Sequence, residues 1–174
     1  MRTAVSVLGM LCAATLLAGC AASTPRAQPV ARSAQPSAAP AVATVTLAAG
    51  FVPDPYNIEI TAGGAQDARN RSAGCTGYIA PAPDLTVFYT SDNANYLSDY
   101  LYVYAASKAD TTLVVQTPSG AWLCNDDDEV LDTIDPWVTI LNPQRGTYRI
   151  WVGTVARDTY PDATLYVSEI DVPG

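Results

Sequence analysis

The sequence predicts an all-β protein: an antiparallel β-sandwich, or a jelly-roll-like variant of one, with seven to nine strands and one disulfide. Three observations support this fold class. Apolar residues recur with a period of two in short runs, turn-forming residues separate the runs, and two cysteines remain after the N-terminal region. No stretch shows the 3.6-residue period of a long helix.

Branched and aromatic residues alternate with other residues in six runs, as in strands that bury one face. The expected strands cover residues 56–61, 85–89, 101–104, 113–115, 148–152 and 165–167. Segments rich in Gly, Pro, Asn and Asp lie between them, at residues 62–64, 81–84, 118–120, 142–146 and 160–162. This regular spacing of strands and turns is typical of a sandwich or a jelly roll.

Residues 1–19 are predicted to be a lipoprotein signal peptide. Arg2 precedes an apolar run from Ala4 to Leu17 that is short for a membrane span. The ending Leu17-Ala18-Gly19-Cys20 resembles the bacterial lipobox, in which the cysteine is acylated and becomes the mature N-terminus. The alternative is an ordinary secretory signal that happens to contain Cys20.

Residues 20–43 are predicted to be the lipidated cysteine and a tether, and residues 44–174 the β-sandwich domain. The tether repeats proline among Ala, Ser and Gln without an apolar period, which favours extended conformations. Lipid on Cys20 would anchor the protein to a membrane of the bacterial envelope without spanning it. Ala21 follows where a sorting aspartate could stand, which by resemblance to the Gram-negative sorting rule implies the outer membrane, facing the periplasm or beyond.

The composition excludes several function classes. The chain has no histidine, so a Ser-His-Asp triad, a Cys-His pair and a His-ligated zinc site are absent. It has 9 Lys and Arg against 17 Asp and Glu, and the scattered bases argue against nucleic acid as a partner. All the acids but only six bases follow residue 43, which gives the domain a net charge of −11. We therefore expect a protein that is not an enzyme.

Cys75 and Cys124 are predicted to form a structural disulfide, because an exported domain folds in an oxidising compartment. The alternative is a reactive thiol pair. That alternative lacks a Cys-x-x-Cys spacing and any histidine or cluster of bases to lower a thiol pKa.

Alternation also predicts which side chains point out of the core. If Leu101, Val103 and their counterparts face inward, then Tyr102, Trp151 and Tyr166 face outward. Should the three strands be neighbours, these rings would form an exposed aromatic stripe that binds sugar rings or a protein partner. The alternative is that the rings cover the second sheet or lie beneath loops.

An acidic loop follows Cys124, with Asp126, Asp127 and Asp128 beside Glu129. Crowded carboxylates repel one another, so a folded loop that holds them benefits from a hard cation such as calcium. Asp110 at a neighbouring turn is a further candidate ligand, because the spacing within the loop is not that of an EF-hand. The alternative is a solvated acidic loop without metal.

Several segments together resemble the bacterial pre-peptidase C-terminal type of β-sandwich. They are Asp110-Thr111-Thr112-Leu113, Trp122-Leu123-Cys124-Asn125-Asp126 and the run from Gly146 to Gly153, within a likeness that covers residues 75–168. The resemblance implies a sandwich used for targeting, adhesion or assembly, with calcium bound in some relatives and Asp110, Asp126 and Asp127 at the matching acidic turns. A lipobox stands where the protease would precede such a domain.

These observations predict a lipid-anchored, non-enzymatic envelope module that binds an envelope protein or a polysaccharide, with calcium as a candidate stabilising ion. One alternative is an envelope protein inhibitor that inserts the acidic loop 126–129 into a basic enzyme cleft. Another is a carbohydrate-active enzyme with paired acids, for which Glu59, Glu129 and Asp135 are candidates that no spacing selects.

Overall fold

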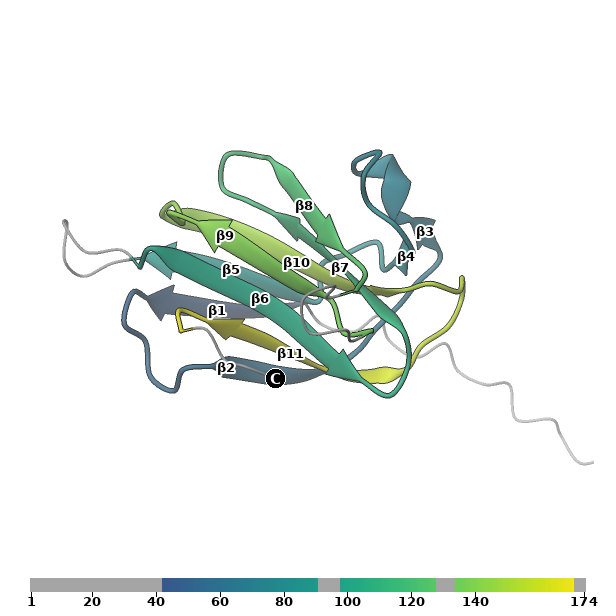
Figure 1. The fold of residues 1–174 in the computed structure, drawn as a ribbon, viewed down its shortest axis with the longest axis horizontal. Helices are drawn as coiled ribbons and strands as arrows, with labels where there is room; N and C mark the ends of the chain where they lie inside the picture. The colour runs from purple at the N-terminus through teal and green to yellow at the C-terminus, as the bar shows by residue number, and fades with distance from the viewer. Residues whose placement is uncertain (1–41, 91–97, 128–133, 171–174) are drawn as a thin grey trace, which may run out of the picture. The chain divides into compact units, whose positions relative to one another are not determined.

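The structure, a computed structural model, describes residues 42–90, 98–127 and 134–170 and confirms the all-β fold. Two sheets lie one over the other, with their strands running in roughly the same direction (Figure 1). These residues contain 11 strands, more than the seven to nine expected, and a disulfide between Cys75 and Cys124. They include no helix long and apolar enough to cross a bilayer. The predicted signal peptide, Cys20 and nearly all of the tether lie outside them.

The smaller sheet, sheet B, is antiparallel throughout and has the strand order β2-β11-β6-β9. Its strands are β2 (Tyr56–Thr61), β6 (Tyr100–Ser107), β9 (Trp137–Leu141) and β11 (Asp162–Ser168). Strand β2 has the predicted bounds, whereas β9 was not among the expected strands. Because β9 pairs with β6 alone, it forms one edge of the sheet.

The larger sheet, sheet A, contains seven strands. They are β1 (Ala43–Ala48), β3 (Gln66–Asp67), β4 (Tyr78–Ile79), β5 (Leu85–Thr90), β7 (Thr111–Gln116), β8 (Trp122–Asn125) and β10 (Gly146–Thr154). Its centre is β10, which pairs with β5, β7 and β4, and β8 lies outside β7. Strands β1 and β5 are parallel, in contrast to the otherwise antiparallel pairing. Strand β1 begins one residue before the predicted domain boundary.

The main core lies between the sheets and is built by the predicted alternation. In β6, Leu101, Val103 and Ala105 are buried, while the residues between them are more exposed. Strand β10 buries Tyr148, Ile150 and Val152 on the same inner side. Burying these apolar side chains is the main favourable contribution to folding.

A second, smaller core lies on the outer face of sheet A, beneath residues 68–79, which we call the covering segment. It consists of buried Ala68, Cys75, Ile79, Val114 and Trp151. The covering segment begins with a short 3-10 helix, Ala68–Asn70, whose first turn is capped by the Asp67 carboxylate. It runs so close to the sheet that a Cβ on Gly77, which has φ 81°, would lie 2.7 Å from the Thr112 side chain. Glycine suits this position because it accepts a positive φ and leaves room for the approach.

Candidate functional site

Five aromatic side chains form one row on the outer face of sheet B, and we call this row the aromatic ladder. Its members are Tyr100, Tyr102 and Tyr104 of β6, Trp137 of β9 and Tyr166 of β11. The β-strand period places them there, because the residues between them on each strand point into the core. Tyr104 is directly opposite Trp137 on one side and Tyr166 on the other.

Most neighbouring rings of the ladder stand face to face, whereas Tyr102 is tilted by 56° against Trp137. The ring of Tyr104 lies 4.4 Å from that of Trp137 and 4.7 Å from that of Tyr166, with interplanar angles of 12° and 6°. These centroid distances are close to the spacing of neighbouring strands, so the stacked rings follow the strand order across the sheet. Neighbouring rings therefore cover one another's flat faces, and the row presents ring edges and hydroxyl groups outward.

The Tyr104 hydroxyl of the ladder remains a hydrogen-bond donor at neutral pH. Burial raises the pKa of Tyr104 above its usual value, and the nearby Tyr166 hydroxyl and Asp54 carboxylate raise it further. Tyr100 continues the row along β6, stacked on Tyr102 at 5.7 Å, and 43% of its surface is exposed. Leu141, directly opposite Tyr100 on β9, is 64% exposed and extends the apolar surface.

The structure separates Trp151 from Tyr102 and Tyr166, so the expected aromatic stripe of these three residues is wrong. Trp151 lies on β10 in sheet A, whereas the two tyrosines lie on sheet B. It does point away from the main core, but it is only 4% exposed because the covering segment lies over it. Trp151 therefore follows the alternative in which loops cover the rings, whereas Tyr102 and Tyr166 lie in the partly exposed row.

Trp137 takes the place in the aromatic face that was expected for Trp151. The run Trp137-Val138-Thr139-Ile140-Leu141 alternates with period two, so the pattern of a strand was present in the sequence. The pairing register of this strand could not be predicted from the sequence, because β9 and β6 are more than thirty residues apart along the chain.

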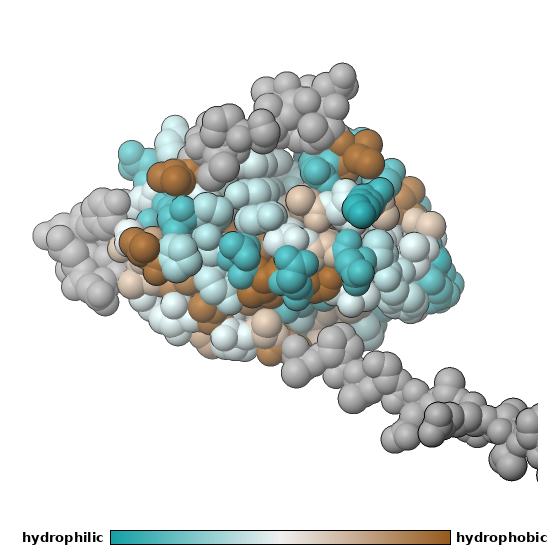
Figure 2. Space-filling model, turned by 90° about the horizontal axis from the view of Figure 1, so that it is seen from below, coloured by the Kyte–Doolittle hydropathy of each residue, from teal (hydrophilic) through white to brown (hydrophobic). Residues whose placement is uncertain are grey.

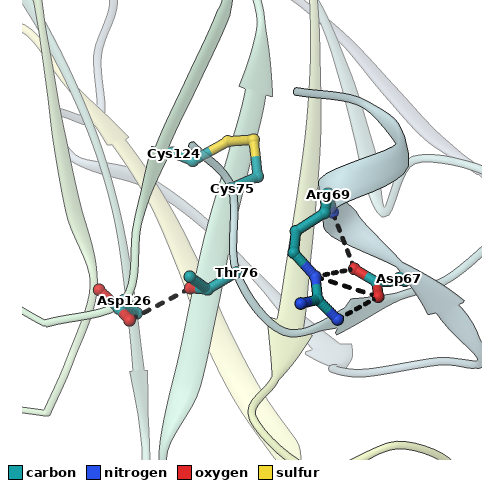
Figure 3. Close-up of a disulfide and its surroundings, with 6 residues drawn as sticks. All are labelled: Asp67, Arg69, Cys75, Thr76, Cys124 and Asp126. Atoms are coloured by element: carbon teal, nitrogen blue, oxygen red, sulfur yellow. Dashed lines mark hydrogen bonds and ion pairs between the residues drawn. A yellow bond between two sulfur atoms is a disulfide. The ribbon is translucent and has the colours of Figure 1, made fainter. Parts of the chain in front are cut away.

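The disulfide joins the covering segment to β8, as Figure 3 shows. The Cα atoms of Cys75 and Cys124 lie 5.1 Å apart, and the pairing confirms the predicted bridge. Next to it, the Thr76 hydroxyl donates a hydrogen bond to the Asp126 carboxylate at 3.1 Å. The acidic loop therefore begins at the point where the covering segment is fastened to the sheet.

The charges of Asp126 and Asp127 act on Asp110, so these three carboxylates lie near one another. The pKa of Asp110 is raised, first by burial and then by the charges of Asp127 and Asp126. In the part of the chain that the structure describes, however, no three acidic or cysteine side chains are arranged to hold a metal ion. Asp128 and Glu129 lie outside that part, so the described residues do not form the predicted calcium site by themselves.

A cavity of about 760 Å³ opens between the sheets at the edge formed by β1 and β2. Ile58, Ile60 and Pro83 form apolar walls, and Asp84 and Asp162 contribute carboxyl groups. Figure 2, seen from the side of β2, shows hydrophobic residues between hydrophilic ones on this face. Burial raises the pKa of Asp84 to about 7, although its carboxylate accepts a hydrogen bond from the Val152 N–H at 2.8 Å.

Two of the candidate catalytic acids, Glu59 and Asp135, line one groove of about 580 Å³ at the ends of β2 and β6. Each has a partner within the fold: Glu59 accepts a hydrogen bond from the Thr164 hydroxyl, and Asp135 accepts one from the Ser107 N–H. The third candidate, Glu129, lies outside the described residues.

No protein-family model matches the chain, and no curated protein matches it.

Proposed function

We propose that the protein is a lipid-anchored, non-enzymatic binding module of the bacterial envelope, and that the aromatic ladder is its binding face. The observation that carries this proposal is the row of five rings on one sheet face, with Tyr100 and Leu141 strongly exposed at its end. Tyrosine and tryptophan combine a large apolar area with a polar tip, and both are enriched in the centres of binding interfaces.

The geometry of the ladder favours an envelope protein as the partner. A polysaccharide that stacks on aromatic residues needs free ring faces, and the neighbours of Tyr104 occupy both of its faces. A protein can instead pack apolar side chains against ring edges and accept hydrogen bonds from the hydroxyls. The protonated state of Tyr104 supports such donation.

The N-terminal residues provide the envelope location in this proposal. Acylation of Cys20 would place the sandwich at the outer membrane on a proline-rich tether. The resemblance to pre-peptidase C-terminal sandwiches, which serve targeting and adhesion, agrees with a module that holds a partner. A palmitate analogue supplied to the cells should label Cys20, and a freely soluble, unlabelled protein would contradict this anchor.

The binding face is tested with a matched pair of variants. Tyr100 and Phe88 are each 43% exposed, but Tyr100 lies on the outer face of sheet B and Phe88 on the outer face of sheet A. We expect Tyr100→Ala, combined with Tyr166→Ala, to abolish cross-linking of the lipidated protein to its envelope partner in living cells. Phe88→Ala should leave the cross-link unchanged. An equal loss in both would contradict a binding face on sheet B.

A further inference from the structure

A cleft of about 420 Å³ separates β8 from β9 at the edge of the sandwich opposite β1 and β2. Among the described strands, each of these two pairs with a single neighbour, so each forms an edge of its sheet. Trp122, Trp137, Ser72, Gly74, Asn125 and Thr139 line the cleft together with the disulfide. Its volume falls within the range of small-molecule binding sites.

Trp137 forms an aromatic wall of this cleft and is held in place by three contacts. Its backbone N–H donates to Asn125 Oδ1 at 2.9 Å, and its indole Nε1–H donates to Thr139 Oγ1 at 3.2 Å. One face of the indole is stacked on Tyr104 of β6. The opposite face is turned toward the free edge of β9, where the cleft lies. Trp137 is the ladder member at the end of the row Tyr166-Tyr104-Trp137, and among the described residues no further ladder ring is stacked on it.

Trp122 contributes a second aromatic wall from β8. It is half-buried, and its ring lies 5.6 Å from that of Trp151 and 5.9 Å from the Arg71 guanidinium. These contacts fix the ring before any ligand arrives, which lowers the entropy lost on binding. The cleft thus has two preorganised indoles, one from each sheet.

The polar groups of the cleft are neutral. Ser72, Asn125 and Thr139 provide hydroxyl and amide groups, and none of the described residues that line the cleft is charged. The Asn125 side-chain carbonyl accepts a hydrogen bond from the Trp137 N–H, and its NH₂ group, for which the described residues supply no recorded acceptor, can donate to a ligand. The described lining is neutral although the domain has a net charge of −11. These lining residues therefore favour neither a cationic nor an anionic ligand.

We propose that this cleft binds a neutral saccharide, with the C–H face of a pyranose ring on the outer face of Trp137. Aromatic faces bury the apolar side of a sugar, and neutral hydroxyl and amide groups hydrogen-bond its hydroxyls. An extended peptide added as a strand fits less well, because the Trp137 N–H at the start of the β9 edge already bonds the Asn125 side chain. The site shares Trp137 with the proposed protein-binding face, but Trp122 and Gly74 are outside the ladder and Tyr166 is outside the cleft, so the two sites can be tested separately.

Gly74 offers a way to fill the cleft without disturbing the fold. A Cβ at Gly74 meets no atom within 4 Å and its φ lies outside the positive range, so a larger side chain is accommodated without strain. Ala73, next to it, is exposed and does not line the cleft. Gly74→Leu and Ala73→Leu are therefore a matched pair in which only the first blocks the site.

The test titrates the lipidated chain, in a detergent without a sugar headgroup, with maltotetraose, cellotetraose and chitotetraose while tryptophan fluorescence is followed. We expect at least one tetrasaccharide to bind at millimolar concentration or below. Gly74→Leu should abolish binding and Trp122→Ala should weaken it roughly tenfold, whereas Ala73→Leu and Tyr166→Ala should leave it unchanged.

Three results would overturn the proposal. The first is the absence of binding by all three tetrasaccharides. The second is binding that persists in Gly74→Leu. The third is competition by an extended Thr/Val-rich peptide that adds to β9, which would assign the cleft to strand addition. Because Tyr166→Ala tests only the ladder, failure of the saccharide site and failure of the protein-binding face are distinguished.

Discussion

The outer faces of the two sheets carry similar aromatic residues but differ in how much of those side chains is exposed. On sheet B, the ladder tyrosines and Trp137 remain partly exposed in a stacked row. On sheet A, Trp151 points outward by the same alternation but is buried beneath the covering segment. Trp122 beside it is half-buried, and Arg71 of the covering segment lies over both indoles, at 5.6 and 5.9 Å from their centroids.

This difference shows that alternation sets only the direction of a side chain, and that the rest of the chain decides its exposure. The covering segment is short and contains little apolar surface of its own, so it is held by specific fastenings. These are the Cys75–Cys124 disulfide, the pairing of β4 with β10 and, just before β5, the hydrogen bond that the Asp84 carboxylate accepts from the Val152 N–H of β10. The outer face of sheet A is thus part of a second core, whereas the outer face of sheet B stays partly exposed.

The largest expected effect comes from truncating a ring on the covered face. Trp151→Ala removes the largest side chain of the second core and should lower the free energy of unfolding by about 3 to 5 kcal/mol. Tyr166→Ala truncates a half-exposed ladder ring and should lower it by about 1 kcal/mol. Urea unfolding of the two variants measures both values, and equal losses would contradict the contrast between the faces.

Trp151→Phe is the control that separates packing from polarity. The Trp151 Nε1 is buried without a hydrogen-bond partner among the described residues, which is unfavourable by itself. Phenylalanine keeps most of the apolar contact and removes that N–H. Trp151→Phe should therefore be considerably more stable than Trp151→Ala.

The disulfide gives the next largest effect. It closes a loop with a sequence separation of 49 residues, for which the chain-entropy estimate is about 4 kcal/mol, and measured values are often smaller. We expect Cys75→Ser with Cys124→Ser to destabilise the domain and to shift the fluorescence of Trp151 to longer wavelength as the covering segment loosens. Cross-linking through the ladder should persist where the variant is folded, and its loss would show that the two faces are not independent.

Asp84 makes the stability of the domain depend on pH. Its pKa is about 7 in the folded protein, against 3.8 for an unperturbed aspartate, because of burial. The folded state therefore binds the proton more tightly, and this group lowers stability as the pH rises from about 4 to about 7. The expected decrease is on the order of 4 kcal/mol, because each pKa unit corresponds to about 1.4 kcal/mol.

Asp84→Asn should remove that part of the pH dependence. The asparagine carbonyl can still accept the hydrogen bond from the Val152 N–H, but it has no charge to bury. The variant should be more stable than the unsubstituted protein at pH 8 and similar to it at pH 4. Parallel pH profiles for the two proteins would show that Asp84 is not the group responsible.

The sequence predicted the elements of this fold better than their arrangement. Period-two alternation located β2, β5, β6, β7, β10 and β11, and the two cysteines of a domain that was expected to be exported indicated the bridge. Local pattern carries no information on which strands pair, so it could not show that Trp151 and Tyr166 lie on different sheets. The parallel pairing of β1 with β5 likewise joins segments about forty residues apart.

The covering segment was the harder part to predict. Its strand β4 and the preceding strand β3 have two residues each and its helix has three, which is too short for a period to appear. Its position depends on long-range contacts such as the disulfide and the close approach of Gly77 to Thr112. The burial of Trp151 follows from that position, and the candidate binding face moved to Trp137 for the same reason.

The smallest expected effect concerns the acidic end of the covered face, where Thr76 binds Asp126. Asp110 is repelled by Asp127 and Asp126, so Asp110→Asn should slightly raise the melting temperature in low salt without calcium, and added sodium chloride should reduce the gain. A calcium site that uses Asp110 requires the opposite sign once millimolar calcium is present, because the variant then loses a ligand while the unsubstituted protein is stabilised by bound ion. Melting curves of both proteins, each with calcium and with chelator, therefore decide between a solvated acidic loop and a metal-linked one.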